Sequence, residues 1–358
     1  MIGKPLFVRR KRPFLHRLPW ILGLGLLAWI ANTIPLDETW AALHQLRAWQ
    51  IGMLVLANGI VLLTLNGRWW LLLRGLGCQL PYLTLVGYRL AAFGVSYFTP
   101  GPQFGGEPVQ VILVEREHGV PRSAALTAVS LDKTLELTVN FAFLLAGVVV
   151  VLQAGTFGDG PAMETAMLAL LLLLGFPLFF LTATWRGWQP LTRLWRWGLG
   201  LPVWRWRTSW HAHFEQAGQL IQTSETQATQ FCRERPFTLA LALIVSIVSW
   251  LVMVAEYWLM LSFLGGPVTA VQVIVLLTAA RVAFLLPAPA GLGTLEASQL
   301  LAFAAIGLNP AIAVSLSLLI RVRDILLGVA GLWWGGRQLR WLRLTVEPPA
   351  SSSGAAGL

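Results

Sequence analysis

Two proline- and glycine-rich segments, each ending in a glutamate, interrupt an otherwise apolar sequence. The first is Thr-Pro-Gly-Pro-Gln-Phe-Gly-Gly-Glu at 99–107, and the second is Leu-Pro-Ala-Pro-Ala-Gly-Leu-Gly-Thr-Leu-Glu at 286–296. Proline lacks an amide hydrogen and glycine adopts backbone conformations that other residues resist, so neither segment continues a regular helix. In a bilayer, non-helical backbone is tolerated only where it is buried in protein or lines a wet cavity. We therefore expect both segments to line a site.

Charged residues recur in the helix that is predicted to follow each segment. They are Asp132, Lys133 and Glu136 after the first segment, and Arg321, Arg323 and Asp324 after the second. A charged side chain at the centre of a membrane helix costs about 2.5–3.5 kcal/mol, so these groups must face protein, water or one another. Their i,i+3 and i,i+4 spacings place charges on one helical face. Two interpretations stay open: salt bridges that only hold helices together, or a charged groove whose cations bind a phosphate and whose carboxylates accept from a head-group amine or hydroxyl.

Glu107 and Glu296 each precede a short apolar helical segment. The N-terminus of a helix favours an anion, which is either the carboxylate itself or a ligand phosphate. The candidate substrate-binding or translocation residues are Arg89, Pro100, Gly105, Gly106, Glu107, Asp132, Lys133, Glu136, Arg281, Gly291, Gly293, Glu296, Arg321, Arg323 and Asp324. The sequence shows no Ser-His-Asp set, no metal-ligand cluster and no Walker motif, so we predict no catalytic residue, no metal and no cofactor.

The composition is typical of a polytopic membrane protein. Of the 358 residues, 56% are hydrophobic and only 12% are charged, and 18 tryptophans suit many membrane–water crossings. The mean hydropathy is +0.67. The formal net charge of +10 could indicate nucleic acid, but the basic residues cluster between the apolar runs, as cytoplasmic loops do. We therefore expect membrane lipids as partners and no nucleic acid.

Six apolar runs approach or exceed the roughly 20 residues that span a bilayer. They are 18–36, 51–73, 124–152, 163–184, 237–263 and 311–334. The pieces around the two breaker segments are shorter, so 82–98 with 108–114 and 271–286 with 297–306 predict two re-entrant helical hairpins. Basic residues at both chain ends, and Arg68 and Arg74 at the end of the second run, mark the cytoplasmic side. The predicted fold class is an all-α polytopic membrane protein with cytoplasmic N- and C-termini.

The domain organisation follows from these runs. We expect a basic cytoplasmic N-terminus at 1–17, one transmembrane domain at 18–340 and a disordered cytoplasmic tail at 341–358. The domain divides into a first repeat at about 50–152, a Trp/Arg-rich segment at about 185–235 and a second repeat at about 237–334. Aromatic and arginine side chains can bind single-stranded nucleic acid, but between spanning helices they favour an interfacial helix on anionic lipid.

The two halves of the chain match each other in pattern. Glu107 and Glu296 are 189 residues apart, and the same shift places Asp132 on Arg321 and brings Arg89 close to Arg281. The charge bias gives the two copies opposite orientations, the first hairpin entering from the cytoplasm and the second from outside. An inverted-topology repeat with interrupted helices is typical of a transporter core whose site lies near the bilayer midplane.

The two breaker segments, the Leu-Asp-Lys-Thr-Leu-Glu stretch at 131–136 and the arginine-bearing last helix resemble the lysylphosphatidylglycerol synthase transmembrane (flippase-like) family. The resemblance covers about residues 15–340. It implies a membrane domain that moves a lipid between leaflets. In full-length synthases a separate soluble domain attaches the amino acid to the lipid. We expect no such domain after residue 340 here. Many stand-alone members lack an assigned substrate, and some are associated with hopanoid or glycolipid pathways. Lys133 stands where this family often has arginine.

We expect a lipid translocase of the bacterial cytoplasmic membrane, acting by passive scrambling or by proton coupling through Glu107, Glu136, Glu256 or Glu296. We expect a transport protein rather than an enzyme. Two alternatives stay open. One is a membrane-embedded lipid-modifying transferase, or an accessory subunit of one, with Asp132 and Glu136 as acid/base groups. The other is a small-solute secondary transporter. A lipid-biosynthetic enzyme is a candidate partner, and the oligomeric state stays open.

Overall fold

The computed structural model describes residues 44, 46–99, 105–153, 161–199, 211–265, 268–286, 288 and 291–345. This described part is helical and contains no β-strand. The predicted N-terminal segment at 1–17, the predicted span at 18–36 and the candidate site residue Pro100 lie outside it.

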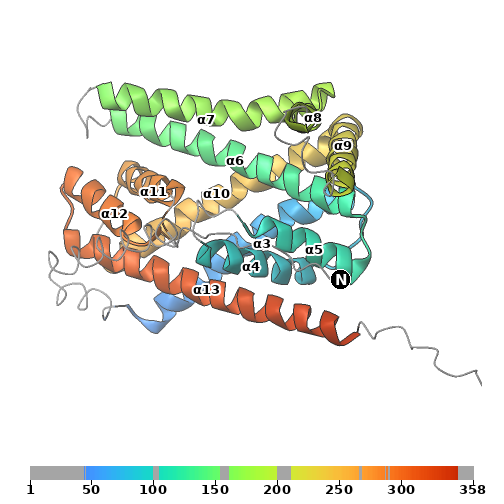
Figure 1. Ribbon diagram of the computed structural model, residues 1–358. Coiled ribbons are helices and arrows are strands. Elements are labelled where there is room, and N and C mark those ends of the chain that lie inside the picture. Colours follow the sequence, from blue (N-terminus) through green and yellow to red (C-terminus); the bar gives the residue numbers. More distant parts are fainter. Residues whose placement is uncertain are drawn as a thin grey trace, which may run out of the picture.

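The helices are labelled as in Figure 1. They are α3 (Ala48–Gly75), α4 (Tyr82–Phe98), α5 (Glu107–His118), α6 (Arg122–Gln153), α7 (Pro161–Arg186), α8 (Pro190–Leu199), α9 (His211–Glu234), α10 (Pro236–Leu264), α11 (Ala270–Leu285), α12 (Thr294–Ala305) and α13 (Pro310–Thr345).

Four helices are long and apolar enough to cross a bilayer: α3, α6, α10 and the Met167–Arg186 part of α7. A helix rises about 1.5 Å per residue, so each of the four reaches or exceeds the roughly 30 Å hydrocarbon core. The predicted span at 311–334 is part of the 36-residue α13, and the charged residues of that span, Arg321, Arg323 and Asp324, lie in the first half of the helix. The chain is therefore a polytopic helical membrane protein, as the composition predicts.

Four shorter helices stand beside these spans. They are α4 with 17 residues, α5 with 12, α11 with 16 and α12 with 12. At about 1.5 Å per residue, none of them reaches across the hydrocarbon core. Helix α4 packs against α5, and α11 packs against α12. The breaker segments fall between the partners, because α5 begins at Glu107 with Pro108 in its first turn and α12 begins just after Gly293.

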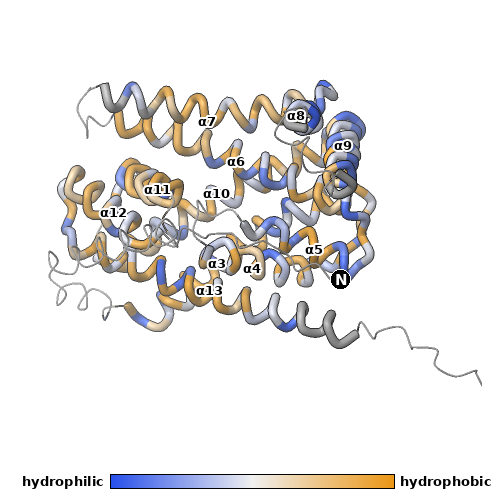
Figure 2. Tube along the Cα trace, viewed as in Figure 1, coloured by the Kyte–Doolittle hydropathy of each residue, from blue (hydrophilic) through white to orange (hydrophobic). Residues whose placement is uncertain are grey.

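The long helices enclose the short ones. Figure 1 shows α6 and α7 side by side along one edge and α13 along the opposite edge. The most extensive helix contacts join α3 to α10 and α4 to α13. Helices α8 and α9, from the predicted interfacial segment, lie together at one end of the molecule (Figure 1). Figure 2 shows mainly hydrophobic residues along α7 and more hydrophilic ones in α9. Helix α13 continues to Thr345, into the segment predicted as a tail, and the rest of that segment lies outside the described residues.

Small residues let α4 and α13 approach closely. A Cβ atom added at Gly331 of α13 would overlap the backbone carbonyl of Leu90 in α4, and one added at Gly335 would lie 2.7 Å from the Cβ atom of Ala91. Glycine at such positions brings two membrane helices into backbone contact, where many weak van der Waals contacts add up. The pairing of α4 with α13 therefore depends on these glycines.

Replacing Gly331 with alanine tests this contact. We expect Gly331→Ala to destabilise the protein by about 1–3 kcal/mol, because neither backbone can move away without breaking the interface. The melting temperature in detergent should fall by about 3 °C or more. Gly336→Ala is the matched control, since a Cβ atom there meets nothing within 4 Å and alanine favours the helix. Equal melting temperatures for the two variants would contradict the prediction.

Candidate functional site

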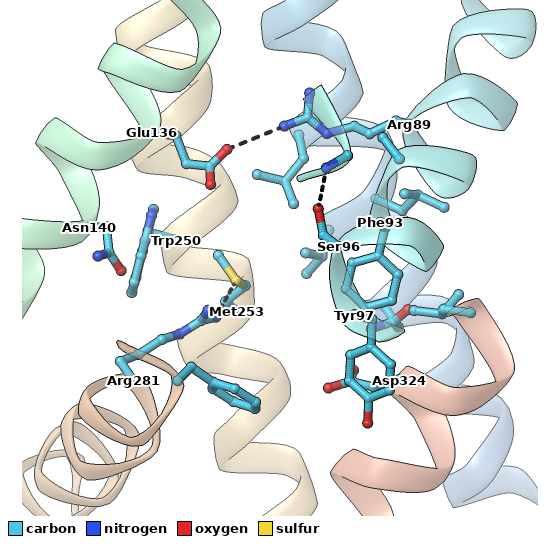
Figure 3. Close-up of a pocket in the computed structure, with 18 of the residues that line it drawn as sticks. Arg89, Phe93, Ser96, Tyr97, Glu136, Asn140, Trp250, Met253, Arg281 and Asp324 are labelled. Atoms are coloured by element: carbon cyan, nitrogen blue, oxygen red, sulfur yellow. Dashed lines mark hydrogen bonds and ion pairs between the residues drawn. The ribbon is translucent and has the colours of Figure 1, made fainter. Parts of the chain in front are cut away.

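A cavity of about 330 Å³ lies between α3, α4, α5, α6, α10, α11 and α13. Its wall combines charged and apolar side chains, part of which Figure 3 shows. The charged ones are Arg89, Glu107, Asp132, Lys133, Glu136, Glu256, Arg281, Arg323 and Asp324. Apolar rings and a thioether, Phe93, Trp250, Phe284 and Met260, line it as well. A cavity of this kind can hold a small polar group beside apolar surface.

Asp132 of α6 is at the centre of the first group of ion pairs. Its Oδ1 atom accepts a hydrogen bond from Nε of Arg68 at 2.6 Å, and its Oδ2 atom accepts one from Nη1 of Arg89 at 3.2 Å. One turn further along α6, Glu136 accepts from Nη2 of Arg68 at 3.1 Å and lies 3.6 Å from Nη2 of Arg89 (Figure 3). Arg68 also donates to the hydroxyl of Ser246 in α10. These contacts tie α3, α4, α6 and α10 together around two carboxylates.

Arg68 is a residue of the ion-pair group that the sequence analysis did not include among the site residues. The sequence analysis placed it with Arg74 at the cytoplasmic end of the run, whereas only 1% of its side chain is exposed. Two turns of α3, including the fully buried Trp69, follow it before the helix ends at Gly75. The sequence did hold a signal that Arg68 is buried and paired. It lies inside the apolar run at 51–73, ahead of further apolar residues, and an arginine there needs an internal carboxylate.

Lys133 bridges two helices. Its ammonium group lies 3.2 Å from Oε1 of Glu107 and 2.9 Å from Oε1 of Glu136. The Oε2 atom of Glu107 accepts a hydrogen bond from the backbone amide of Gly105 at 2.9 Å. The carboxylate of Glu107 therefore occupies the N-terminus of α5, which is one of the two options that the sequence left open.

The two glycines before Glu107 have separate roles. Gly105 has φ +139, a backbone conformation that side chains rarely adopt. A Cβ atom at Gly106 would overlap the backbone carbonyl of Ala92, and its amide donates to the hydroxyl of Ser96 at 2.9 Å. The breaker segment thus holds the start of α5 directly against α4.

A second ion pair lies behind the cavity wall. Arg321 of α13 binds Glu296 of α12 through both Nε and Nη2, the latter at 2.7 Å, and Nη2 also donates to the carbonyl of Gly291 at 2.9 Å. Gly291 and Gly293 have φ +64 and +75, in the left-handed region that glycine tolerates. The side chains of Glu296 and Arg321 are only 4% and 10% exposed, and neither lines the cavity.

A third group faces the cavity from α13. Arg323 donates to Oε1 of Glu256 in α10 and to Oδ1 of Asp324, both at 2.9 Å. Glu256 also accepts from Nδ2 of Asn58 in α3 at 3.1 Å. Glu256 lies within the predicted span at 237–263, and the sequence analysis named it only for proton coupling. Its isolation within that apolar run was the signal that a cation must meet it.

The predicted site residues divide into two sets. Those that line the cavity are Arg89, Gly106, Glu107, Asp132, Lys133, Glu136, Arg281, Arg323 and Asp324. Those that do not are Gly105, Gly291, Gly293, Glu296 and Arg321, while Pro100 lies outside the described residues. Within the described part of the chain, no three His, Cys, Asp or Glu side chains gather as a metal site would require.

The buried pair of Glu296 and Arg321 makes a testable prediction. Glu296→Gln leaves the guanidinium group of Arg321 buried without its carboxylate, which costs about 3–5 kcal/mol. We expect the melting temperature in detergent to fall by roughly 6 °C or more. Glu115→Gln is the matched control, because Glu115 and Arg122 form an exposed pair at 3.6 Å that contributes about 1 kcal/mol or less. A loss no larger than that of the control would show that the pair is dispensable.

Comparison with known proteins identifies the family. The family described as "Lysylphosphatidylglycerol synthase TM region" matches residues 18–331. No curated protein and no solved structure matches the chain. The family match includes both breaker segments and every residue that lines the cavity. The chain therefore belongs to the lysylphosphatidylglycerol synthase transmembrane-region family.

Proposed function

We propose that this protein moves a polar-headed lipid between the leaflets of a bilayer, with the head group in the cavity and the acyl chains in the surrounding lipid. The cavity is the observation that carries the proposal. About 330 Å³ is at the lower end of the range for small-molecule pockets, so it suits a head group better than a whole lipid. A charged cavity among membrane helices is costly to maintain, so it favours a function over packing alone.

The lining supports an amphipathic substrate. Charged groups of α6 and α13 meet aromatic and aliphatic side chains such as Phe93, Trp250 and Phe284 in one space. A small polar solute needs no apolar wall, whereas a lipid presents a charged head next to its glycerol and first methylenes. The lining therefore favours a lipid translocase over a small-solute transporter.

Equivalent helix contacts in the two halves support an inverted repeat. Helix α4 packs on α13, and its counterpart α11 packs on α6. Likewise α5 contacts α6 as α12 contacts α13, and α3 contacts α6 as α10 contacts α13. Transporters built from such repeats bind their substrate where the repeats meet, near the midplane. In this proposal, the short paired helices are the two re-entrant hairpins.

Two side-chain contacts are also equivalent in the two halves. Glu107 at the start of α5 pairs with Lys133 on the next helix, and Glu296 at the start of α12 pairs with Arg321 on the next helix. Three residues after each glutamate stands a buried glutamine, Gln110 or Gln299. This agreement in contacts, beyond the agreement in sequence pattern, is hard to obtain by chance alignment.

A lipid-modifying transferase is the second candidate, but the geometry favours it less. An acid/base group needs an oxygen atom free to exchange a proton with a substrate. Both carboxylate oxygens of Asp132 accept from arginines, and both oxygens of Glu136 contact cations. These carboxylates position cations around the cavity, so they are poorly placed to act as catalysts.

Reconstitution tests the proposal directly. The purified protein is placed in liposomes with a fluorescently labelled phospholipid, and the accessible fraction of label is followed with a membrane-impermeant quencher. We expect label to exchange between leaflets faster than in protein-free liposomes. No acceleration with any phospholipid or glycolipid tested would overturn the proposal. Chemical conversion of the lipid in detergent, where no leaflets exist, would favour the transferase.

A substitution that fills the cavity predicts a loss of transport. Asn140 lines the cavity beside Trp250 and takes part in none of its ion pairs (Figure 3). Asn140→Phe adds bulk there without removing a charge, so we expect lipid exchange to slow by about tenfold or more, which corresponds to about 1.4 kcal/mol in the barrier. Val149→Phe is the control, because Val149 lies on the same helix with its side chain exposed. Equal rates for the two variants would place the lipid path outside this cavity.

A further inference from the structure

Five cationic side chains in and around the cavity already bind a carboxylate. Arg68 and Arg89 bind Asp132 and Glu136, Lys133 binds Glu107 and Glu136, Arg323 binds Glu256 and Asp324, and Arg321 binds Glu296. An anionic ligand that approached one of these cations would compete with a carboxylate held at close range. These five groups are therefore poor primary contacts for a ligand anion.

Arg281 of α11 differs from them. Its guanidinium group lies over the ring of Trp250, with 4.8 Å from its Cζ atom to the ring centroid. Its Nη2 atom lies 2.8 Å from the sulfur of Met253, which is a weak acceptor. Among the described residues, no carboxylate comes within 4.0 Å of it. Arg281 is thus a cation in the cavity wall whose two direct side-chain contacts, Trp250 and Met253, are both uncharged.

The nearby carboxylates cannot easily turn toward Arg281. Glu256 is shared by Arg323 and Asn58, and Asp324 is bound by Arg323. Glu136 is bound by Lys133 and Arg68. Figure 3 shows Arg281 at one side of the cavity, below Trp250 and Asn140, with Phe93, Tyr97 and Asp324 on the other side. Several guanidinium N–H groups of Arg281 are therefore available to a group that enters the cavity.

We infer that Arg281 is the anion-binding residue of this cavity and that it binds the phosphodiester group of a phospholipid. This inference rests on the proposed function and adds the residue and the head-group chemistry. A planar guanidinium group matches two phosphate oxygens at once, and it gains most where water is scarce. Stacking on Trp250 holds the guanidinium plane in place and leaves its N–H edge for the ligand.

Free phosphate would offer the same oxygens, but the surroundings favour a lipid. Phe284, Leu285 and Met260 line the cavity together with Arg281, so the space beside the bound anion is apolar. Glycerol and methylene groups attached to a phosphodiester would fill that space, whereas inorganic phosphate would leave it empty or wet. Diacylglycerol with the same acyl chains as the phospholipid lacks only the phosphodiester and its head group, so it is the neutral control lipid for a binding test.

Lipid binding to the full chain in detergent micelles tests the inference. Native mass spectrometry measures the bound fraction of phosphatidylglycerol and of matched diacylglycerol, for the wild type and for Arg281→Gln, Arg281→Lys and Arg122→Gln. We expect Arg281→Gln to weaken phosphatidylglycerol binding by about tenfold or more and to leave diacylglycerol binding unchanged. Arg281→Lys should retain an intermediate affinity, because it keeps the charge but not the paired donors. Arg122→Gln, whose exposed side chain contacts Glu115, should bind like the wild type.

Thermal stability separates a ligand contact from a structural one. Arg281→Gln removes a half-buried cation that has no carboxylate partner, so its melting temperature without lipid should equal or exceed that of the wild type. Phosphatidylglycerol should raise the melting temperature of the wild type but not of this variant. A lower melting temperature of Arg281→Gln without lipid, or unchanged phosphatidylglycerol binding, would overturn the inference.

Three further outcomes keep this inference distinct from the proposed function. If inorganic phosphate alone binds in an Arg281-dependent manner and phosphatidylglycerol binds no better than diacylglycerol, the assignment to a phospholipid is wrong. If the wild type exchanges lipid in liposomes and Arg281→Gln exchanges phosphatidylglycerol at the same rate, the inference fails while the translocase proposal stands. Arg281-dependent binding without any exchange by the wild type would support the inference and count against the translocase.

Discussion

The buried carboxylate of Asp132 is the constraint on which the membrane core depends. It lies on a spanning helix, α6, where an unpaired charge would be expelled or would carry water with it. Arg68 from α3 and Arg89 from α4 both bind this carboxylate. The three helices must therefore pack together at the level of Asp132, so that none of these charges is left unpaired. Removal of one partner would leave a charge buried without compensation, which costs more than the complete pair gains. The arrangement of α3, α4 and α6 therefore follows from charge neutralisation as much as from apolar packing.

The sequence predicted the positions of the helices better than it predicted which side chains contact one another. Apolar runs, bounded by prolines, glycines and basic residues, located α4 at 82–98 and placed the ends of α10 and α11 within one residue. Position along the chain does not determine which cation meets which carboxylate, because that depends on how the helices rotate and pack. Lys133 of α6 binds Glu107 of α5, and Arg68, which the sequence analysis used only to mark the cytoplasmic side, binds Asp132. The role of Gly331 could not be predicted either, since nothing in its sequence context says that Leu90 lies against it.

The two breaker segments play unequal parts in this structure, although their proline, glycine and glutamate patterns are alike. Glu107 and Lys133 line the cavity with side chains 27% and 24% exposed, whereas Glu296 and Arg321 are sealed behind its wall. Under the proposed inverted repeat, the two halves would share one construction but adopt different states at a given moment. Alternating access requires such a difference, because a site that both halves left open would leak. The sequence could not reveal this asymmetry, because the same glycine and glutamate pattern is compatible with either state.

The proposed role of Arg281 follows from a difference in pairing among the cations of the cavity. Each carboxylate on α6, α10 and α13 already has a cation, so the charges there serve to hold helices together and to keep the cavity polar. Arg281 has an aromatic face and a sulfur atom in their place. An aromatic ring orients a guanidinium group without neutralising it, which preserves its attraction for an incoming anion. A salt bridge at this position would be more stable in the empty cavity and would bind a lipid phosphate less well, because the ligand would first have to displace a carboxylate.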